Sequence, residues 1–422
     1  MKIAIVAHEI SPQQGSECAE GWNVVLNLAN YRDLDLTIFC SVGPQLGADE
    51  YKQAISQYFE KNPPRSLTFK YVEYSRICKI MASINSRFFG SLSGIGLPFL
   101  YYICYRSWQN GVAKLIKSIH RESQFDCIHL LTQITYRHPG KFYKLGIPFF
   151  WGPTGGSETI PLSFIASLPI HVRTIELIRL VVTKVSHVML QSVRKAAKNS
   201  SVIYAFSDPD HDFFSNYATT KKMVDGATSV TNPEMRKLAP GGTLEILWVG
   251  QLTDRKLPFL IIDLMKKYPD LEDKVNFTML GSGVRKAALT EALAVSGLSN
   301  IRILEQIPHK EVATIMRDSH FLLHTSYREA GTHIIPEALS SGLPVICHAV
   351  SGMNLTISPS NGFKVELVSY THSINKIASY LYEITETPNL VAEKSCGAIS
   401  FAEINTWNHM AQVFREDYLN VK

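Results

Sequence analysis

The chain has 422 residues, of which 45% are hydrophobic and 19% charged, and its formal net charge is +5. This balance excludes an intrinsically disordered protein, and the length favours two domains over one. The seven cysteines form no Cys-x-x-Cys pair, which argues against a zinc site and is typical of reduced thiols in a cytoplasm.

Apolar, strand-like runs alternate with helix-length segments along the whole chain, which predicts a parallel α/β architecture. The first run begins near Met1 and is typical of a buried strand, so we expect no signal peptide. The turn-rich residues 221–240 interrupt the pattern, which restarts at Glu245 and predicts a domain boundary near 230–244. The expected strands are Ile3–Ala7, Leu36–Cys40, Leu67–Val72, Cys127–Leu131, Phe149–Trp151, Val202–Phe206, Glu245–Val249, Asn276–Leu280, Ile301–Leu304, His320–His324 and Val345–Cys347.

The loop after the first strand ends in Gly15-Ser16-Glu17 and leads into an amphipathic helix. A loop followed by a helix N-terminus forms a cradle for anions. Glu17 and Glu20 are interpreted as partners of the helix dipole, and Glu17 is alternatively a candidate catalytic residue.

A basic segment follows, because Arg76–Arg121 holds seven Lys and Arg and no acidic residue, interleaved with aromatic side chains. One interpretation is a pair of core-packing helices with solvated basic faces. The other is a surface for a membrane or an anionic acceptor, since basic residues gain free energy near an anionic leaflet. The apolar run from Gly90 to Cys104 is too short for a membrane span, and no nucleic-acid motif is present.

Two further segments of the first half carry polar candidates. His129 lies on a predicted strand, where a lone histidine is more often packed than reactive. The run Pro148–Glu158 ends in Gly155-Gly156-Ser-Glu158, and Glu158 is either a contact for an acceptor or a cap of the next helix.

The second half begins with cations and glycines placed after strands. Arg255 and Lys256 follow the strand that ends at Val249, and Gly281-Ser-Gly283 follows the next strand as a tight turn. Preorganised cations in such a loop stabilise a departing anion.

Two carboxylates, Glu329 and Glu337, stand eight positions apart around a predicted helix start near Thr332. The helix is expected to close at Gly342-Leu-Pro344 before a buried strand. Unpaired N–H groups and the positive dipole end at Gly331 and Thr332 suit a phosphate. One carboxylate can then touch a sugar and the other a ribose, with a diphosphate between them.

This stretch resembles the donor-sugar motif of the family-4 retaining glycosyltransferases of GT-B fold, with a Ser-x-x-Glu start, a Glu-Ala-Leu centre and a Gly-x-Pro-Val end. The loop from Trp248 to Lys256 is similar to the Gly-Arg-Leu-x-x-x-Lys loop of that family. Lys256 falls on the family lysine, while Gln251 stands where arginine is usual and Arg255 is the candidate to replace it.

Further segments resemble the same family. The resemblance assigns the nucleotide to the Gly281 and Gly283 backbone and base readout to the main chain around Ile307. It also assigns the β-phosphate and the acceptor to the loop at Gly15 and Ser16. Two other similarities are an Asp-x-x-His strand that ends at His129 and a closing Phe401…Trp407…Tyr418 pattern. The Trp-Gly-Pro-x-Gly-Gly-x-Glu run resembles bacterial surface-polysaccharide transferases, in which Gly155, Gly156 and Glu158 would face the acceptor.

The resemblance implies two doubly wound Rossmann-like domains that face a cleft, at residues 1–235 for the acceptor and 236–400 for the nucleotide sugar. Residues 401–422 would form a helix that crosses back onto the first domain. In this interpretation Lys256 and Arg255 hold the leaving phosphates, Glu329 holds the sugar and Glu337 clasps the ribose. Glu17 and His129 complete the acceptor-side candidates.

The implied function is a metal-independent, retaining hexosyltransferase that uses a UDP-sugar in preference to a GDP-sugar, with no cofactor. Its acceptor would be a glycan or polyprenyl-linked glycan of a capsule or lipopolysaccharide, at the inner face of the cell membrane. The segment Arg76–Arg121 would supply peripheral membrane contact. Two alternatives stay open: a nucleotide-sugar epimerase or hydrolase-like enzyme of the same fold, and a non-catalytic partner in a polysaccharide-assembly complex.

Overall fold

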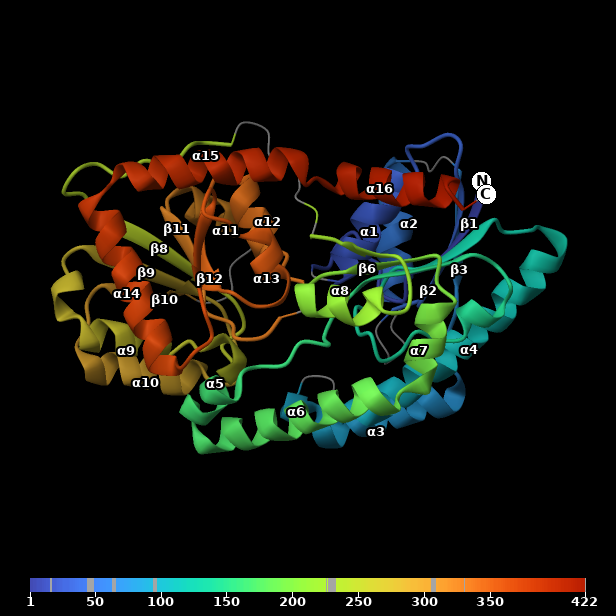
Figure 1. The fold of residues 1–422 in the computed structure, drawn as a ribbon, viewed down its shortest axis with the longest axis horizontal. Coiled ribbons are helices and arrows are strands. Elements are labelled where there is room, and N and C mark those ends of the chain that lie inside the picture. Colours follow the sequence, from blue (N-terminus) through green and yellow to red (C-terminus); the bar gives the residue numbers. More distant parts are fainter. Residues whose placement is uncertain are drawn as a thin grey trace. The chain divides into compact units, whose positions relative to one another are not determined.

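The computed structural model describes residues 1–15, 17–43, 49–62, 66–93, 97–224, 226, 233–304, 309–329 and 331–421. The chain divides into two compact α/β units, shown in Figure 1. The first unit comprises Met1–Ser157, Ser186–Met223 and Trp407–Lys422, and the second comprises Glu158–Val185 and Val224–Thr406.

The first unit is built on a seven-stranded parallel sheet with the strand order β3-β2-β1-β4-β5-β6-β7. Its central strands are buried on both faces, as expected for a parallel sheet covered by helices. The order reverses between β1 and β4, and a ligand site is expected beyond the carboxyl ends of these two strands. The strands are β1 (Lys2–Val6), β2 (Asp35–Cys40), β3 (Leu67–Tyr71), β4 (Cys127–Leu130), β5 (Phe149–Thr154), β6 (Val202–Ala205) and β7 (Thr220–Lys222).

The helices of the first unit cover this sheet, with one buried cluster that contains the Ile3 and Ile5 side chains and another that contains Ala4 and Val6. Side chains of β1 alternate between the two clusters because successive residues of a strand point to opposite faces. The helices are α1 (Glu17–Leu28), α2 (Glu50–Lys61), α3 (Arg76–Ser93), α4 (Pro98–Glu122), α7 (Gln191–Lys198), α8 (Asp208–Ser215) and α16 (Trp407–Leu419), and a 3-10 turn covers Phe142–Lys144.

The second unit repeats the same topology with six parallel strands in the order β10-β9-β8-β11-β12-β13. The strands are β8 (Leu244–Val249), β9 (Val275–Leu280), β10 (Ile301–Leu304), β11 (Phe321–His324), β12 (Val345–His348) and β13 (Gly362–Val365). The helices are α5 (Leu162–Ser167), α9 (Leu260–Lys267), α10 (Lys286–Ser296), α11 (His309–Arg317), α12 (Ile334–Ser340), α13 (Ser351–Thr356), α14 (Tyr370–Glu386) and α15 (Asn389–Ile404), with 3-10 turns at Asp254–Lys256 and Pro269–Leu271. Helix α6 (Ile170–Met189) begins in this unit, and its last four residues are grouped with the first.

The final helix returns to the first unit, as the sequence predicts. Figure 1 shows α16 beside α1, and its Phe414 and Tyr418 are fully buried there. Asp417 accepts a hydrogen bond from the Tyr204 hydroxyl at 2.9 Å and pairs with Lys221 at 2.5 Å. The two doubly wound domains and the returning helix of the predicted fold are therefore present.

The division of the chain differs from the predicted one in one segment and at two boundaries. Residues 158–185, predicted in the first domain, belong to the second unit, and the later boundary falls at 223/224 instead of 235/236. The return begins at Trp407 because α15 extends to Ile404 in the second unit. Within the described residues, no helix is long and apolar enough to cross a membrane.

Candidate active site

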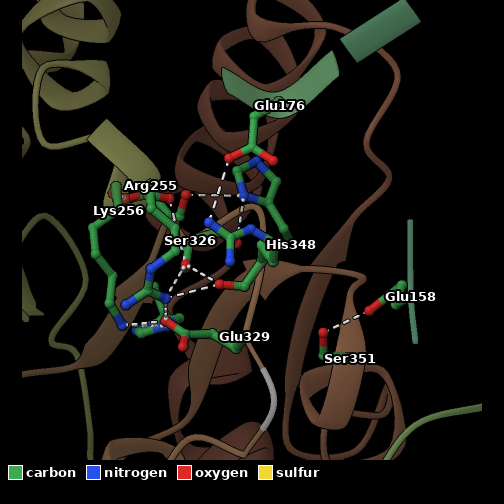
Figure 2. Close-up of polar contacts among 11 residues, drawn as sticks. Glu158, Glu176, Arg255, Lys256, Ser326, Glu329, His348 and Ser351 are labelled. Atoms are coloured by element: carbon green, nitrogen blue, oxygen red, sulfur yellow. Dashed lines mark hydrogen bonds and ion pairs between the residues drawn. The ribbon is translucent and has the colours of Figure 1, made fainter. Parts of the chain in front are cut away.

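An ion cluster lies at the carboxyl ends of β8 and β11 in the second unit (Figure 2). One oxygen of Glu329, Oε1, contacts both the Lys256 ammonium and the Arg255 guanidinium. The His324 ring completes the cluster, with Nε2 at 3.2 Å from Lys256 Nζ and 3.5 Å from Glu329 Oε1. The sequence-predicted catalytic residues Arg255, Lys256 and Glu329 thus lie together.

Burial and charge set the protonation states of this cluster. Burial alone would raise the pKa of Glu329, but its contact with His324 and the charges of Lys256 and Arg255 outweigh burial and hold that pKa well below its usual range. Burial lowers the pKa of Lys256, while the Glu329 charge opposes this shift. Burial and the Lys256 charge lower the pKa of His324 to about 4, so the ring is neutral at pH 7.

Hydrogen bonds tie the loop that carries the two cations to the segment after β11. The Thr325 hydroxyl donates to the Lys256 carbonyl at 2.5 Å and accepts from Trp248 Nε1 at 2.9 Å. Arg255 Nη1 donates to Ser326 Oγ at 3.2 Å and to the Arg328 carbonyl at 2.8 Å. These bonds fix the cations opposite Glu329, as a preorganised site requires.

A second set of polar side chains supports the Ser326–Glu329 segment, and sequence reasoning missed it. His348 Nδ1 lies 3.1 Å from the Thr325 carbonyl and 3.2 Å from the Ser326 carbonyl, and burial lowers its pKa to about 4. Glu176 of α6 is buried and pairs with Arg328 at 3.3 Å. His324 and His348 are each the last residue of a strand, and their place at the carboxyl edge of the sheet was the available signal.

The predicted glycine turn after β9 packs backbone to backbone on the loop after β8. A Cβ on Gly281 would lie 1.9 Å from the Gly250 carbonyl oxygen, and Gly283 has φ +152. The Leu252 amide donates to the Ser282 carbonyl at 2.9 Å. Glycine is required at this close approach, and the contact of this turn with a nucleotide remains a prediction.

The predicted donor-binding helix is α12, which begins at Ile334, two residues after Thr332. Gly331 and Thr332 lie just before it, and Glu337 is half-buried within its first turns. Gly342 follows the helix with φ +80, as its predicted closing position requires. Ile307 lies outside the described residues.

In the first unit, Glu17 opens α1 and lies beside a second carboxylate, Glu9, in the loop after β1. Glu17 Oε1 accepts the amide of Ile134, and Glu9 Oε1 accepts Gln133 Nε2 at 3.0 Å. Burial and mutual repulsion raise the pKa of Glu17, and burial raises that of Glu9. Gly15 is exposed in the same loop, and Ser16 lies outside the described residues.

The side chain of His129 is fully buried, which argues against its predicted contact with an acceptor. Its Nδ1 accepts the Tyr418 hydroxyl at 2.5 Å, and its Nε2 donates to the Gly152 carbonyl at 2.6 Å. Burial lowers its pKa to about 4. The neutral ring therefore packs the sheet against α16, which is the alternative that the sequence favoured.

The Gly155–Glu158 run is divided between the units. Gly155 exchanges backbone hydrogen bonds with the loop at 134–136, and Gly156 has φ +92 with open space beside it. Glu158 belongs to the second unit, where Ser351 Oγ donates to its Oε2 at 2.5 Å (Figure 2). Helix α5 begins at Leu162 with Pro161 at its N-cap and no side-chain cap, so Glu158 is not its cap.

Within the described ranges, no group of three or more His, Cys, Asp or Glu side chains is arranged to hold a metal ion. The expected independence from metal remains a prediction, because it concerns the reaction.

The second unit resembles known glycosyltransferases in sequence. Residues 232–393 match the family model described as glycosyl transferases group 1. The chain is 28% identical over 181 residues to a component of human phosphatidylinositol N-acetylglucosaminyltransferase, in an alignment that covers 38% of this chain and 36% of that protein. It is 24% identical over 200 residues to D-inositol 3-phosphate glycosyltransferase of Corynebacterium aurimucosum, with 45% and 46% covered. The chain thus spans less than half the length of these curated relatives.

Similarity to solved structures extends over the whole chain. The lipopolysaccharide outer core galactosyltransferase WaaB superposes with a TM-score of 0.62 at 13% identity and covers 100% of this chain and 99% of its own. Anabaena Alr3699/HepE in complex with UDP gives 0.59 at 16% identity, with 100% of both chains covered. At these identities the match establishes the fold. Two Rossmann-like domains of GT-B type therefore form this protein, and its second domain matches group 1 glycosyl transferases in sequence.

Proposed function

We propose that this protein is a retaining glycosyltransferase that moves a hexose from a UDP-sugar, in preference to a GDP-sugar, to a glycan or lipid-linked glycan. The observation that carries the proposal is the partly buried Lys256–Arg255–Glu329 cluster within the part of the chain that matches glycosyl transferases. The acceptor would belong to a bacterial surface polysaccharide, which the resemblance of the Trp151–Glu158 run supports.

The reaction breaks the bond between the anomeric carbon and the diphosphate oxygen, and the electron pair stays on the diphosphate. An acceptor hydroxyl oxygen forms the new bond to the anomeric carbon on the same face, and its proton leaves with the diphosphate. Lys256 and Arg255 then face growing negative charge, which charge-assisted hydrogen bonds stabilise strongly. One oxygen of Glu329 pairs with both cations, so one positive charge of the cluster stays uncompensated by Glu329. A bound diphosphate would take over these cations and free Glu329 to hold sugar hydroxyls and the positive charge at the anomeric carbon.

The other donor contacts are assigned by position. Glu337 on α12 would clasp the ribose hydroxyls, and the Gly281–Gly283 turn would approach the nucleotide through its backbone. Charge stabilisation would come from protein cations, so the proposal includes activity without a metal ion.

Contact with the membrane at the acceptor domain belongs to the same proposal. Helix α3 buries Cys78 and Ala82, but it exposes Ile77, Ile80 and Phe88 by 61–71% beside the basic residues of Arg76–Arg121. An apolar stripe beside basic side chains suits the surface of an anionic bilayer.

A thermal-shift screen with UDP, GDP, ADP and their sugars, with and without magnesium, tests the donor site. Ligand at 100 times its dissociation constant stabilises by about 2.7 kcal/mol. We expect a shift with the UDP series in the absence of metal, and its loss in Lys256→Ala and Glu337→Ala. Lys266→Ala is the matched control, because Lys266 is exposed on α9.

Other outcomes separate the alternatives. No shift with any nucleotide would contradict the donor site. Consumption of donor without an acceptor would indicate an epimerase or hydrolase. Nucleotide binding without turnover, unchanged by Glu329→Ala, would indicate a non-catalytic partner.

A further inference from the structure

Helix α6 exposes most of its hydrophobic residues, although Val172 and Leu180 pack against the core, and it buries two polar ones, which reverses the usual pattern of a surface helix. Its inward residues include Glu176 and Thr183, each 3% exposed. Its exposed large hydrophobic side chains are Ile170, Ile175, Leu177, Ile178, Val181, Val182, Val185 and Met189, which are 40–71% exposed. Such a large exposed apolar surface marks an interaction site.

From Ile175 to Met189 the exposed apolar side chains form one continuous face, while the first turn also exposes the polar His171 and Thr174 on this side. At about 100° per residue, the seven exposed apolar positions from Ile175 to Met189 span about 160° of the helix circumference. A coiled-coil seam, with two apolar positions in seven, is narrower. The arc suits a broad apolar medium better than a single partner helix.

The charged side chains that border the apolar face of α6 indicate what this face contacts. Lys184 and Arg173 flank one side of the arc and Arg179 flanks the other, while Glu176, the only acidic residue of α6, is buried and paired with Arg328. A second copy of α6 would bring cations against cations, because the one carboxylate of α6 is buried. An anionic lipid headgroup complements this border.

We propose that α6 lies in the plane of an anionic phospholipid surface, with Ile175, Ile178, Val181, Val182 and Val185 among its acyl chains. The flanking cations contact the headgroups. This surface is distinct in sequence from Arg76–Arg121 and does not depend on the proposed reaction. It makes α6 a second membrane-facing element of the chain.

Co-sedimentation of the full chain with phosphatidylcholine vesicles, with and without phosphatidylglycerol, tests the proposal. We expect binding to the anionic vesicles that falls about tenfold or more in Ile178→Ser/Val182→Ser. The control Val284→Ser/Val295→Ser removes aliphatic side chains that are 78% and 80% exposed elsewhere in the second unit, and it should bind like the wild type. Lys184→Gln should weaken binding only to anionic vesicles at low salt.

A site-specific label distinguishes α6 from the α3 surface. In a Cys396→Ser background the remaining cysteines are buried, so Val182→Cys and Val295→Cys can be labelled individually. Lipids that carry a quencher should quench the label at 182 and not at 295. Absence of vesicle binding, or bound protein with an unquenched label at 182, overturns the proposal. Self-association that Ile178→Ser/Val182→Ser abolishes, without vesicle binding, assigns the face to a second copy and also overturns it.

Discussion

At the scale of single residues, Glu17 and Glu9 form a crowded acidic pair beyond the carboxyl ends of β1 and β4. Glu9 Oε1 accepts hydrogen bonds from Gln133 and Tyr101, and Glu17 Oε1 accepts one from Ile134. Burial and the nearby Glu9 charge raise the pKa of Glu17 from an ordinary value of 4.5 to about 8. The pair lies at the switch point of the sheet, where ligands bind in such folds.

This pair makes the stability of the first unit depend on pH. The folded-state pKa of Glu17 is raised, so protonated Glu17 contributes to the free energy of unfolding. This contribution is at its maximum below pH 4.5 and is lost as pH rises to about 8. Glu17→Gln removes the buried charge, so the variant should gain roughly 1–3 kcal/mol relative to the wild type between pH 5 and pH 8.5. Denaturant unfolding at the two pH values measures this difference.

The control for that comparison is Glu60→Gln, an exposed carboxylate on α2. It should change stability equally at both pH values. If the stability of Glu17→Gln relative to the wild type is also the same at both pH values, the pKa of Glu17 is not raised in the folded protein.

Some residues of the candidate site were predictable and others were not. Lys256 and Glu329 each follow a predicted strand, and parallel strands bring such positions to one edge of the sheet. Their direct contact, and the part of Arg255 in it, depend on side-chain direction, which spacing does not give. His129 lies within β4 and not after it, and its partner Tyr418 is 289 positions away, so their contact was not visible in the local sequence.

At the scale of elements, the glycine turn after β9 fixes the distance between two loops of the candidate site. Gly281→Ala would place a Cβ 1.9 Å from the Gly250 carbonyl oxygen, so one loop must move. We expect a loss of about 1–3 kcal/mol in the free energy of unfolding and weaker nucleotide binding. Urea unfolding and nucleotide titration of the variant measure the two effects.

Gly297→Ala supplies the comparison for this prediction. Gly297 also has a positive φ, +71, but a Cβ there meets nothing within 4 Å. Its substitution should cost about 1 kcal/mol through the backbone alone and leave nucleotide binding unchanged. Equal losses of stability and of nucleotide binding in both variants would show that close packing of the two loops determines neither property.

Hydrophobic runs predicted every strand except β7 and β13, which each lie at one edge of a sheet. The three residues of β7 are exposed or half-buried, and β13 begins with Gly362. Neither produces an apolar run, because β7 is Thr-Lys-Lys and β13 is Gly-Phe-Lys-Val, whereas the opposite edge strands β3 and β10 are richer in apolar residues. The hydrophobic pattern therefore predicted the parallel α/β architecture while missing these two strands.

At the scale of the whole molecule, the sequence predicted the return of α16 but not the transfer of residues 158–185 to the second unit. The Phe164 and Leu168 side chains of this segment are buried in the core of that unit. A helical pattern reveals that a face is apolar and not which surface it covers. The closing aromatic residues of α16 were identified by resemblance to a family. That resemblance implied the surface on which the helix packs, which hydrophobic periodicity does not indicate.

Because α16 belongs to the first unit while the preceding residues belong to the second, α16 should stabilise the first unit selectively. Phe414 is fully buried against the rings of His129 and Tyr204, at 4.9 and 4.6 Å between centroids. We expect Phe414→Ala to destabilise the first unit by about 3–5 kcal/mol. Hydrogen exchange would then rise in β1, β4 and β6 and stay unchanged in β8, β9 and β11. Gln412→Ala, an exposed change on the same helix, should alter neither set. An equal rise in both sheets would mean that the two units unfold as one.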